Sequence, residues 1–236
     1  MSPQANNLGF LYIDQNGMLL YTTTTPAVIT FPFPQDIVRD LEIINKELLQ
    51  KEMAKIFKDN SLQPSRYVFA LSGNLLFEKP FRDSKTPESQ KEIQSFLENI
   101  PFEHTATIIF ENAESKLIAT NKDIYQTFSR IFEQQGSTVE YILPAYVLGI
   151  DVNQALSMTQ PLLSDLHRRA PSLRQYSFFT DVVRPPQKNP DQGKKEDKKP
   201  DTDDDKKAKK RSILLIGVFV VLLLILGIVA FFSLLS

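Results

Sequence analysis

The chain has 236 residues, with 27 Lys and Arg against 28 Asp and Glu, and it contains no cysteine, which excludes disulfide bonds, thiolate catalysis and cysteine-ligated zinc. Residues 184–211 hold 11 of the basic and 7 of the acidic residues, so residues 1–183 carry a net charge of −5. Nucleic acid is therefore not an expected partner, because phosphate binding requires a basic patch.

The first third of the sequence predicts three antiparallel strands and a helix. In residues 8–24, Phe10 and Tyr12 and then Leu19 and Tyr21 stand at alternate positions on either side of Asn16-Gly17. This dipeptide most readily adopts the positive φ angles of a type I′ hairpin turn. Residues 27–33 predict the third strand. Apolar residues then recur at helical spacing from Ile37 to Lys58, which predicts a long amphipathic helix.

The middle of the sequence predicts a buried strand followed by a shorter strand and a helix. Residues 66–73, RYVFALSG, are apolar almost throughout, which is typical of a central strand covered on both faces. A short strand is expected at 75–81. The helix at 86–101 has Thr86 as its N-cap and Pro87 at its first position.

The last third continues to alternate between strand and helix. Strands are expected at 105–111, 116–120 and 138–144, and a helix at 121–136, capped by Asn121 and ended by Gly136. A last helical region is expected from about Asp151 to Phe179, with a bend or a break at Pro161. This order predicts one α/β domain over residues 1–183. It consists of a mixed sheet with helices on both faces, in the ribonuclease H-like and actin-like layout, around a single core.

The C-terminal residues predict a tether and a membrane anchor. Residues 184–211 contain no aliphatic or aromatic residue larger than Ala208, so we expect a disordered charged linker with a reach of about 30 Å. Residues 212–235 run for 24 positions without a charge, a proline or an amide, which predicts one C-terminal transmembrane helix.

A basic cluster stands immediately before this predicted span. Its members are Lys206, Lys207, Lys209, Lys210 and Arg211. By the positive-inside rule they place the N-terminal domain in the cytoplasm, and they favour contact with anionic headgroups. The expected location is the cell membrane, with a single pass.

Two kinds of catalysis belong to such a layout, and the sequence disfavours both. A two-metal nuclease would need a third carboxylate beside Asp14 and either Glu42 or Glu47, but Ser-Gly-Asn stands at 72–74, after the fourth strand. An actin-type ATPase would need phosphate-binding hairpins in two related halves, and Asp14 is the one weak candidate for cofactor binding. No Walker, GxGxxG or GxSxG motif occurs.

The two histidines do not predict a metal site. His104 and His167 lack ligand spacing to each other, and His167 stands at a basic helix end where we expect a cation that complements the helix dipole. The domain is therefore predicted to be a binding module, with no enzymatic activity, cofactor or metal.

Three stretches resemble a known family: YVFALSGNLLFEKPF, ESQKEIQSFLENIPF and IATNKDIYQTFSRIFEQQGSTVEYILPAYVLGI. They are similar, as a general layout over residues 8–180, to the actin-like cytoplasmic proteins of bacterial type IV pilus and type II secretion inner-membrane platforms, of PilM and GspL type. The resemblance implies a platform that binds other assembly proteins, joined in the secretion branch to a single membrane span. Asp14 occupies the place of the first phosphate-loop aspartate, while the nucleotide-binding loops themselves are not recognisable.

The leading hypothesis is a membrane-tethered, non-catalytic scaffold with protein partners in an inner-membrane complex. Sheet edges or the apolar residues of LRQYSFFTDVV would supply the contact, with Phe178 and Phe179 as candidates, although packing back on the domain is the simpler interpretation of both. The alternative is a degenerate actin-like nucleotide-binding protein or ATPase that uses Asp14, ATP and Mg²⁺. A eukaryotic tail-anchored protein of vesicle traffic ranks third, since residues 184–211 lack the expected heptad repeat.

Overall fold

The computed structural model describes residues 7–81, 86–110 and 115–179. These residues fall within residues 1–187, one of two units into which the chain divides. None of the helices in these ranges is long and apolar enough to cross a membrane. The predicted linker at 184–211, its basic cluster and the predicted span at 212–235 lie outside the described residues.

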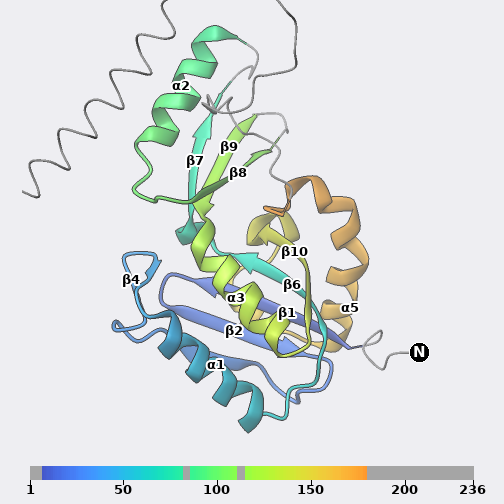
Figure 1. Cartoon of the computed structure of the whole chain (residues 1–236). Coiled ribbons are helices and arrows are strands. Elements are labelled where there is room, and N and C mark those ends of the chain that lie inside the picture. The colour runs from blue at the N-terminus through green and yellow to red at the C-terminus, as the bar shows by residue number, and fades with distance from the viewer. Residues whose placement is uncertain (1–6, 82–85, 111–114, 180–236) are drawn as a thin grey trace, which may run out of the picture. The chain divides into compact units, whose positions relative to one another are not determined.

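The described ranges contain strands, α-helices and short 3-10 helices in a largely alternating order (Figure 1). The strands are β1 Leu8–Asp14, β2 Gly17–Thr22, β3 Ile29–Pro32, β4 Val38–Arg39, β5 Glu42–Ile43, β6 Arg66–Leu71, β7 Leu76–Pro80, β8 Thr105–Phe110, β9 Lys116–Asn121 and β10 Thr138–Pro144. The helices are α1 Lys46–Asp59, α2 Pro87–Glu98, α3 Lys122–Gln134, α4 Val152–Leu156 and α5 Gln160–Arg169, with 3-10 turns η2 Gly73–Leu75, η3 Ala145–Leu148 and η4 Ala170–Tyr176.

The central sheet is mixed and has five strands in the order β10-β6-β1-β2-β3. The first three strands along the chain are antiparallel neighbours, whereas β6 pairs in parallel with β1 and β10 pairs in parallel with β6. This arrangement confirms the predicted mixed α/β sheet and the interior position of residues 66–71. It also leaves β10 and β3 as the two edge strands.

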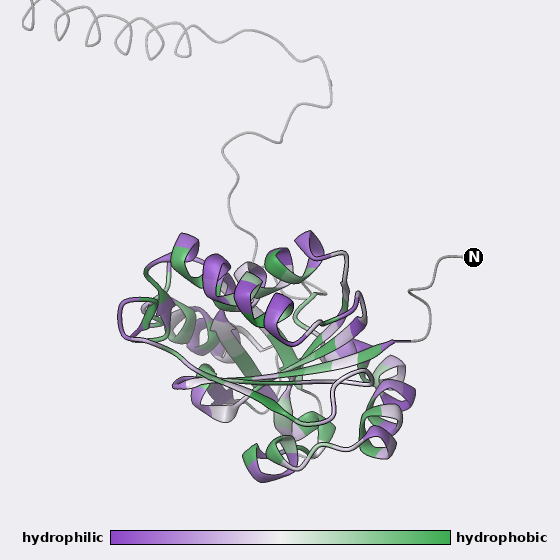
Figure 2. Cartoon of the chain, turned by 90° about the horizontal axis from the view of Figure 1, so that it is seen from below, coloured by the Kyte–Doolittle hydropathy of each residue, from purple (hydrophilic) through white to green (hydrophobic). Residues whose placement is uncertain are grey.

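Helices cover both faces of this sheet, as predicted (Figure 2). On one face α1 and α3 pack on side chains that include Leu11, Phe69 and Ile142. On the other face α4 and α5 pack on side chains that include Phe10 and Val68. Because successive side chains of a strand point to opposite faces, the apolar runs of β1 and β6 supply both layers.

A group of aromatic rings fixes α3 on the central sheet. Phe132 of α3 lies edge-to-face against Phe57 of α1 and against Tyr67 and Phe69 of β6, with ring centroids 5.0, 4.6 and 5.2 Å apart. Phe132, Tyr67 and Phe69 are fully buried. Edge-to-face contacts add to the free energy gained by burial alone, so this cluster is a strong contributor to the stability of the domain.

A second, smaller sheet departs from the predicted single sheet. Strands β7, β9 and β8 form a separate antiparallel sheet, with α2 packed on it through Phe81, Ile93 and Leu117. The predicted strand at 75–81 is therefore present, but η2 intervenes after β6 and the strand pairs with β9. Alternation along a strand shows which face is apolar and does not show which strand is its neighbour.

The prediction of a helix from Ile37 to Lys58 is wrong in its first part. Residues 37–45 form the β4–β5 hairpin instead, and its turn residues Asp40 and Leu41 have φ angles of 51° and 63°. Helix α1 begins only after Asn45, whose side chain accepts a hydrogen bond from the Leu48 N–H at 3.0 Å. The hairpin buries Ile37 just as a helix would, so the apolar spacing did not distinguish the two structures.

The first hairpin exists, but its turn differs from the predicted one. Asp14 pairs with Gly17, so the turn residues are Gln15 and Asn16, and neither Asn16 nor Gly17 has a positive φ angle. Gly17 is needed for another reason. A Cβ atom there would lie 2.6 Å from the Phe31 carbonyl oxygen on β3, which approaches the backbone too closely for any side chain.

The helix boundaries predicted from capping residues agree with the structure. Thr86 caps α2, Asn121 caps α3, and Gly136 follows α3 with a φ angle of 78°. The break in the last helical region falls between α4 and α5, so Pro161 lies in the first turn of α5. These positions carry local signals that tertiary packing did not override.

Candidate functional site

Two segments that are 58 residues apart in the sequence meet at the carboxyl end of the central sheet. The Asp14 carboxylate, at the end of β1, accepts hydrogen bonds from the Ser72 hydroxyl and from the Asn74 side-chain amide, the latter at 3.0 Å. Sheets of this class bind ligands outside the carboxyl ends of their parallel strands. Asp14 and residues 72–74 therefore form the first candidate site.

The surroundings of Asp14 are acidic. Tyr12 is almost fully buried, and burial, followed by the nearby charges of Asp14 and Asp151, raises the pKa of its hydroxyl above the ordinary value. In the described ranges, no group of three or more His, Cys, Asp or Glu side chains is placed to hold a metal ion. At this end the Asp14 carboxylate is bonded to a hydroxyl and an amide, with the charge of Asp151 nearby. Glu42 and Glu47, the other carboxylates considered for a two-metal site, belong to β5 and α1.

Residues 177 and 178, near the end of the described ranges, form hydrogen bonds with the edge strand β10. The Phe178 N–H donates to the Ile142 carbonyl at 2.9 Å, and the Ile142 N–H donates to the Ser177 hydroxyl oxygen at 3.1 Å. Phe178 is 2% exposed and stacks on Tyr125, with ring centroids 6.1 Å apart. Of the two predicted partner-contact residues, Phe178 is thus a core residue.

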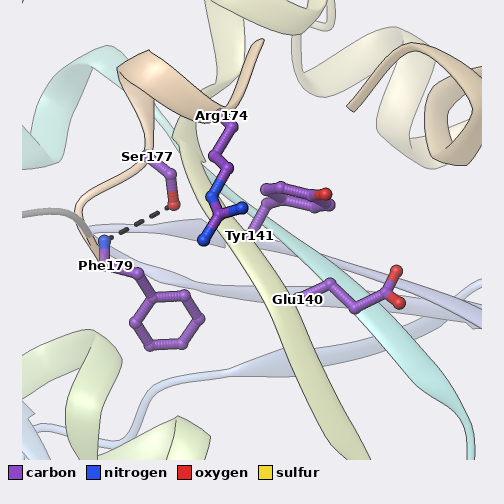
Figure 3. Close-up of a pocket in the computed structure, with 5 residues that line it drawn as sticks. All are labelled: Glu140, Tyr141, Arg174, Ser177 and Phe179. Carbon is purple, nitrogen blue, oxygen red and sulfur yellow. Dashed lines mark hydrogen bonds between the residues drawn. The ribbon is translucent and has the colours of Figure 1, made fainter. Parts of the chain in front are cut away.

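Phe179 has the opposite environment. It is 47% exposed and lines a cavity of about 380 Å³ together with Glu140, Tyr141, Arg174 and Ser177. We call this cavity the edge pocket, because it lies beside the edge strand β10. Figure 3 shows the Arg174 guanidinium between the rings of Phe179 and Tyr141.

Glu140 forms one wall of the edge pocket and is held from within the domain. The register of β10 on β6 shifts between Val139 and Tyr141, which makes Glu140 the extra residue of a β-bulge. Its carboxylate lies 3.2 Å from Arg66 Nη1 and 3.5 Å from His167 Nδ1. The negative charge of this wall is therefore already compensated.

His167 is buried, contrary to the expectation of a cation at a helix end. Its side chain is 6% exposed, and its Nε2 lies 2.8 Å from the Gly9 carbonyl oxygen. Burial lowers the pKa of the imidazole below its ordinary value, and this effect outweighs the opposing effects of the Gly9 carbonyl and the Glu140 carboxylate. The neighbouring Arg66 charge acts in the same direction as burial.

This pKa shift predicts a loss of stability in mild acid. The unfolded chain takes up a proton at the ordinary imidazole pKa of 6.5, before the folded protein does, so the free energy of unfolding falls as the pH drops below that value. His167→Gln should reduce this dependence, measured by urea unfolding of the full chain in mild detergent between about pH 7.5 and about pH 5.5. His104→Gln is the matched control, since that side chain is 58% exposed. An unchanged pH dependence in His167→Gln would show that His167 is not the group responsible for the loss of stability in mild acid.

Sequence reasoning missed four residues of the edge pocket, namely Glu140, Tyr141, Arg174 and Ser177. A single acidic residue inside the apolar strand TVEYILP was the available signal for Glu140. Arg174 lies in the segment LRQYSFF that the sequence did single out, but nothing in the sequence showed that this segment returns to β10.

Comparison with known proteins gives matches among solved structures. No protein-family model matches the chain, and no curated protein matches it. A PilM-PilN type IV pilus biogenesis complex matches with 14% identity and a TM-score of 0.42, over 60% of this chain and 48% of that chain. The cytoplasmic domain of EpsL, an inner membrane component of the type II secretion system of Vibrio cholerae, matches with 10% identity and a TM-score of 0.36, over 62% and 60%.

A third match is a Bacteroides thetaiotaomicron protein with an actin-like ATPase fold and unknown function. Its identity is 11% and its TM-score is 0.34, over 59% of this chain and 54% of that chain. The chain thus spans between 48% and 60% of the lengths of these three structures.

Proposed function

We propose that this chain is a membrane-tethered scaffold, without catalytic activity, whose α/β domain binds a protein partner at the edge pocket. The observation that carries the proposal is that one pocket at the edge of the central sheet is lined by both an exposed aromatic ring, Phe179, and the Arg174 guanidinium. Aromatic and arginine side chains around a pocket are the usual centres of binding energy in protein interfaces.

The position of the pocket suits a recruiting role. Only four residues separate Phe179 from the start of the predicted linker at Arg184, so a partner bound there would be held close to the point where the tether begins. With the predicted linker and membrane span, such a domain would gather its partner within reach of a membrane surface and raise its local concentration.

The narrower part of the proposal concerns the assembly. We assign the chain to an inner-membrane complex of an envelope machine such as a type IV pilus or a secretion platform, with the domain in the cytoplasm and a single pass. The resemblance of residues 8–180 to that family in general layout and the basic cluster before residues 212–235 support this assignment.

Co-purification from native membranes after mild crosslinking tests the proposal. Phe179→Asp should reduce recovery of the partner about tenfold or more, because it places a charge where an apolar contact is expected. Leu156→Asp is the matched control, since Leu156 of α4 is 49% exposed and does not line the edge pocket. Equal recovery with both variants would refute a partner site at Phe179.

A second candidate function is nucleotide binding at the carboxyl end of the sheet. It is favoured by the position of Asp14, where the Ser72 hydroxyl and the Asn74 amide converge on one carboxylate. Calorimetric titration of the full chain with ATP and Mg²⁺ should then show binding that Asp14→Ala abolishes. Absence of heat at millimolar nucleotide would eliminate this candidate.

A further inference from the structure

We infer that the edge pocket takes an extended, acidic segment of a partner protein, which places an apolar side chain on Phe179 and a carboxylate on Arg174. This inference rests on the proposed function and adds the chemistry of the partner to it. It follows from the backbone pairing at β10, from the charges around the pocket and from the spacing of side chains along a strand.

The backbone pairing indicates an extended ligand. β10 is an edge strand, and the domain already adds backbone to that edge at one point, where residues 177–178 bond to Ile142. Main-chain hydrogen bonds to a sheet edge are a recurring way to bind an extended peptide, with pockets that read alternate side chains. The edge pocket lies directly beside this pairing, since Ser177 belongs to both.

The charges around the edge pocket indicate that the ligand carries a carboxylate. Among the described residues, no hydrogen bond or ion pair involves the Arg174 side chain, which is exposed. Glu140, the acidic residue of the pocket, is already paired with Arg66. The pocket therefore presents one uncompensated positive charge on a domain of net charge −5. A guanidinium binds a carboxylate in a planar, bidentate manner that an amide cannot reproduce.

The spacing of side chains along an extended ligand indicates how one segment can contact both Phe179 and Arg174. Side chains at positions i and i+2 of a strand point to the same side and lie roughly 6.5 Å apart, so one extended segment can place two side chains in the same pocket. The expected ligand therefore carries an apolar residue and an Asp or Glu two positions apart. A lysine in place of the carboxylate would be repelled by Arg174.

Selection from a displayed library of random peptides of about six residues, the usual length of a strand, tests this inference on the full chain in mild detergent. Peptides that also bind the Phe179→Asp variant are removed first. Those that remain should be enriched in an apolar residue and an acidic residue at the i, i+2 spacing. With Arg174→Gln the acidic enrichment should fall about tenfold, which corresponds to the loss of one charge-assisted hydrogen bond.

Arg168→Gln is the matched control, because Arg168 is an exposed arginine of α5 that pairs with Asp165 and does not line the pocket. It should leave the acidic enrichment unchanged. Absence of acidic enrichment with the wild-type chain, or its persistence with Arg174→Gln, would overturn the inference. If the inference about acidic segments failed but Phe179→Asp still lost the native partner, the proposed function would stand. Failure of the inference and failure of the proposed function are therefore distinguishable.

Discussion

Gly9→Ala should destabilise the domain by about 3 kcal/mol, because the new methyl group has no space. A Cβ atom at Gly9 would lie 2.1 Å from Cε1 and 2.3 Å from Cδ1 of Tyr67, which is 0% exposed. Phe69 and Phe132 pack edge-to-face against the Tyr67 ring and restrict its movement. Replacement of a strand glycine by alanine otherwise gains up to about 1 kcal/mol, which is smaller than the expected clash.

Gly73→Ala is the matched control for this substitution. Nothing lies within 4 Å of the Cβ position at Gly73, and its φ angle is not positive, so the stability should change by less than about 0.5 kcal/mol. Urea unfolding of the full chain in mild detergent measures both variants. A Gly9→Ala protein as stable as the wild type would show that β1 and Tyr67 do not pack as described.

Phe132→Ala should cost about 4 kcal/mol, the largest effect that we expect from a single truncation in this domain. The substitution removes a fully buried ring and three edge-to-face contacts, which join α3 to α1 and to β6. Each such contact contributes about 1 kcal/mol beyond area burial, and the cavity left between α3 and the sheet adds to the loss.

Phe179→Ala provides the comparison for Phe132→Ala with the same change of side chain. Phe179 is 47% exposed, so its truncation should change the free energy of unfolding by no more than about 0.5 kcal/mol. Thermal unfolding followed by circular dichroism measures both proteins. If Phe179→Ala destabilised as much as Phe132→Ala, Phe179 would be a core residue and the edge pocket would lose its exposed ring.

The order of strands and helices was largely predictable, because it depends on local patterns. The apolar run at 66–71 indicated an interior strand, and Thr86, Asn121 and Gly136 marked helix ends through capping and positive φ. These signals depend on a few neighbouring residues and on the backbone conformation that those residues favour.

Pairing and turn geometry were not predictable in the same way. Asn16-Gly17 predicted a type I′ turn, yet Gly17 is required by the close approach of Phe31 on β3. Conversely, Asp40 and Leu41 adopt positive φ angles without a glycine, where the β4–β5 hairpin packs on the rest of the domain. The Asn121 side chain donates to the Leu41 carbonyl at 3.0 Å, a contact between positions 80 residues apart that no local pattern encodes.

The candidate site was predictable only in part, for the same reason. The sequence pointed to Phe178 and Phe179, but both are phenylalanines in one apolar segment, and only the pairing of residues 177–178 with Ile142 decides which ring is buried. Glu140 enters the pocket through a β-bulge, and a one-residue insertion into a ladder leaves no periodic signal in a strand of seven residues.

Site-specific photo-crosslinking in native membranes tests the central claim most directly. A photoreactive phenylalanine analogue replaces Phe179 in one protein and Leu156 in another, since the two side chains are equally exposed. We predict that position 179 crosslinks to a defined partner protein, that position 156 does not, and that Arg174→Gln weakens the crosslink. Identical crosslinking patterns at both positions, or a crosslink at 156 alone, would contradict a partner site at the edge pocket.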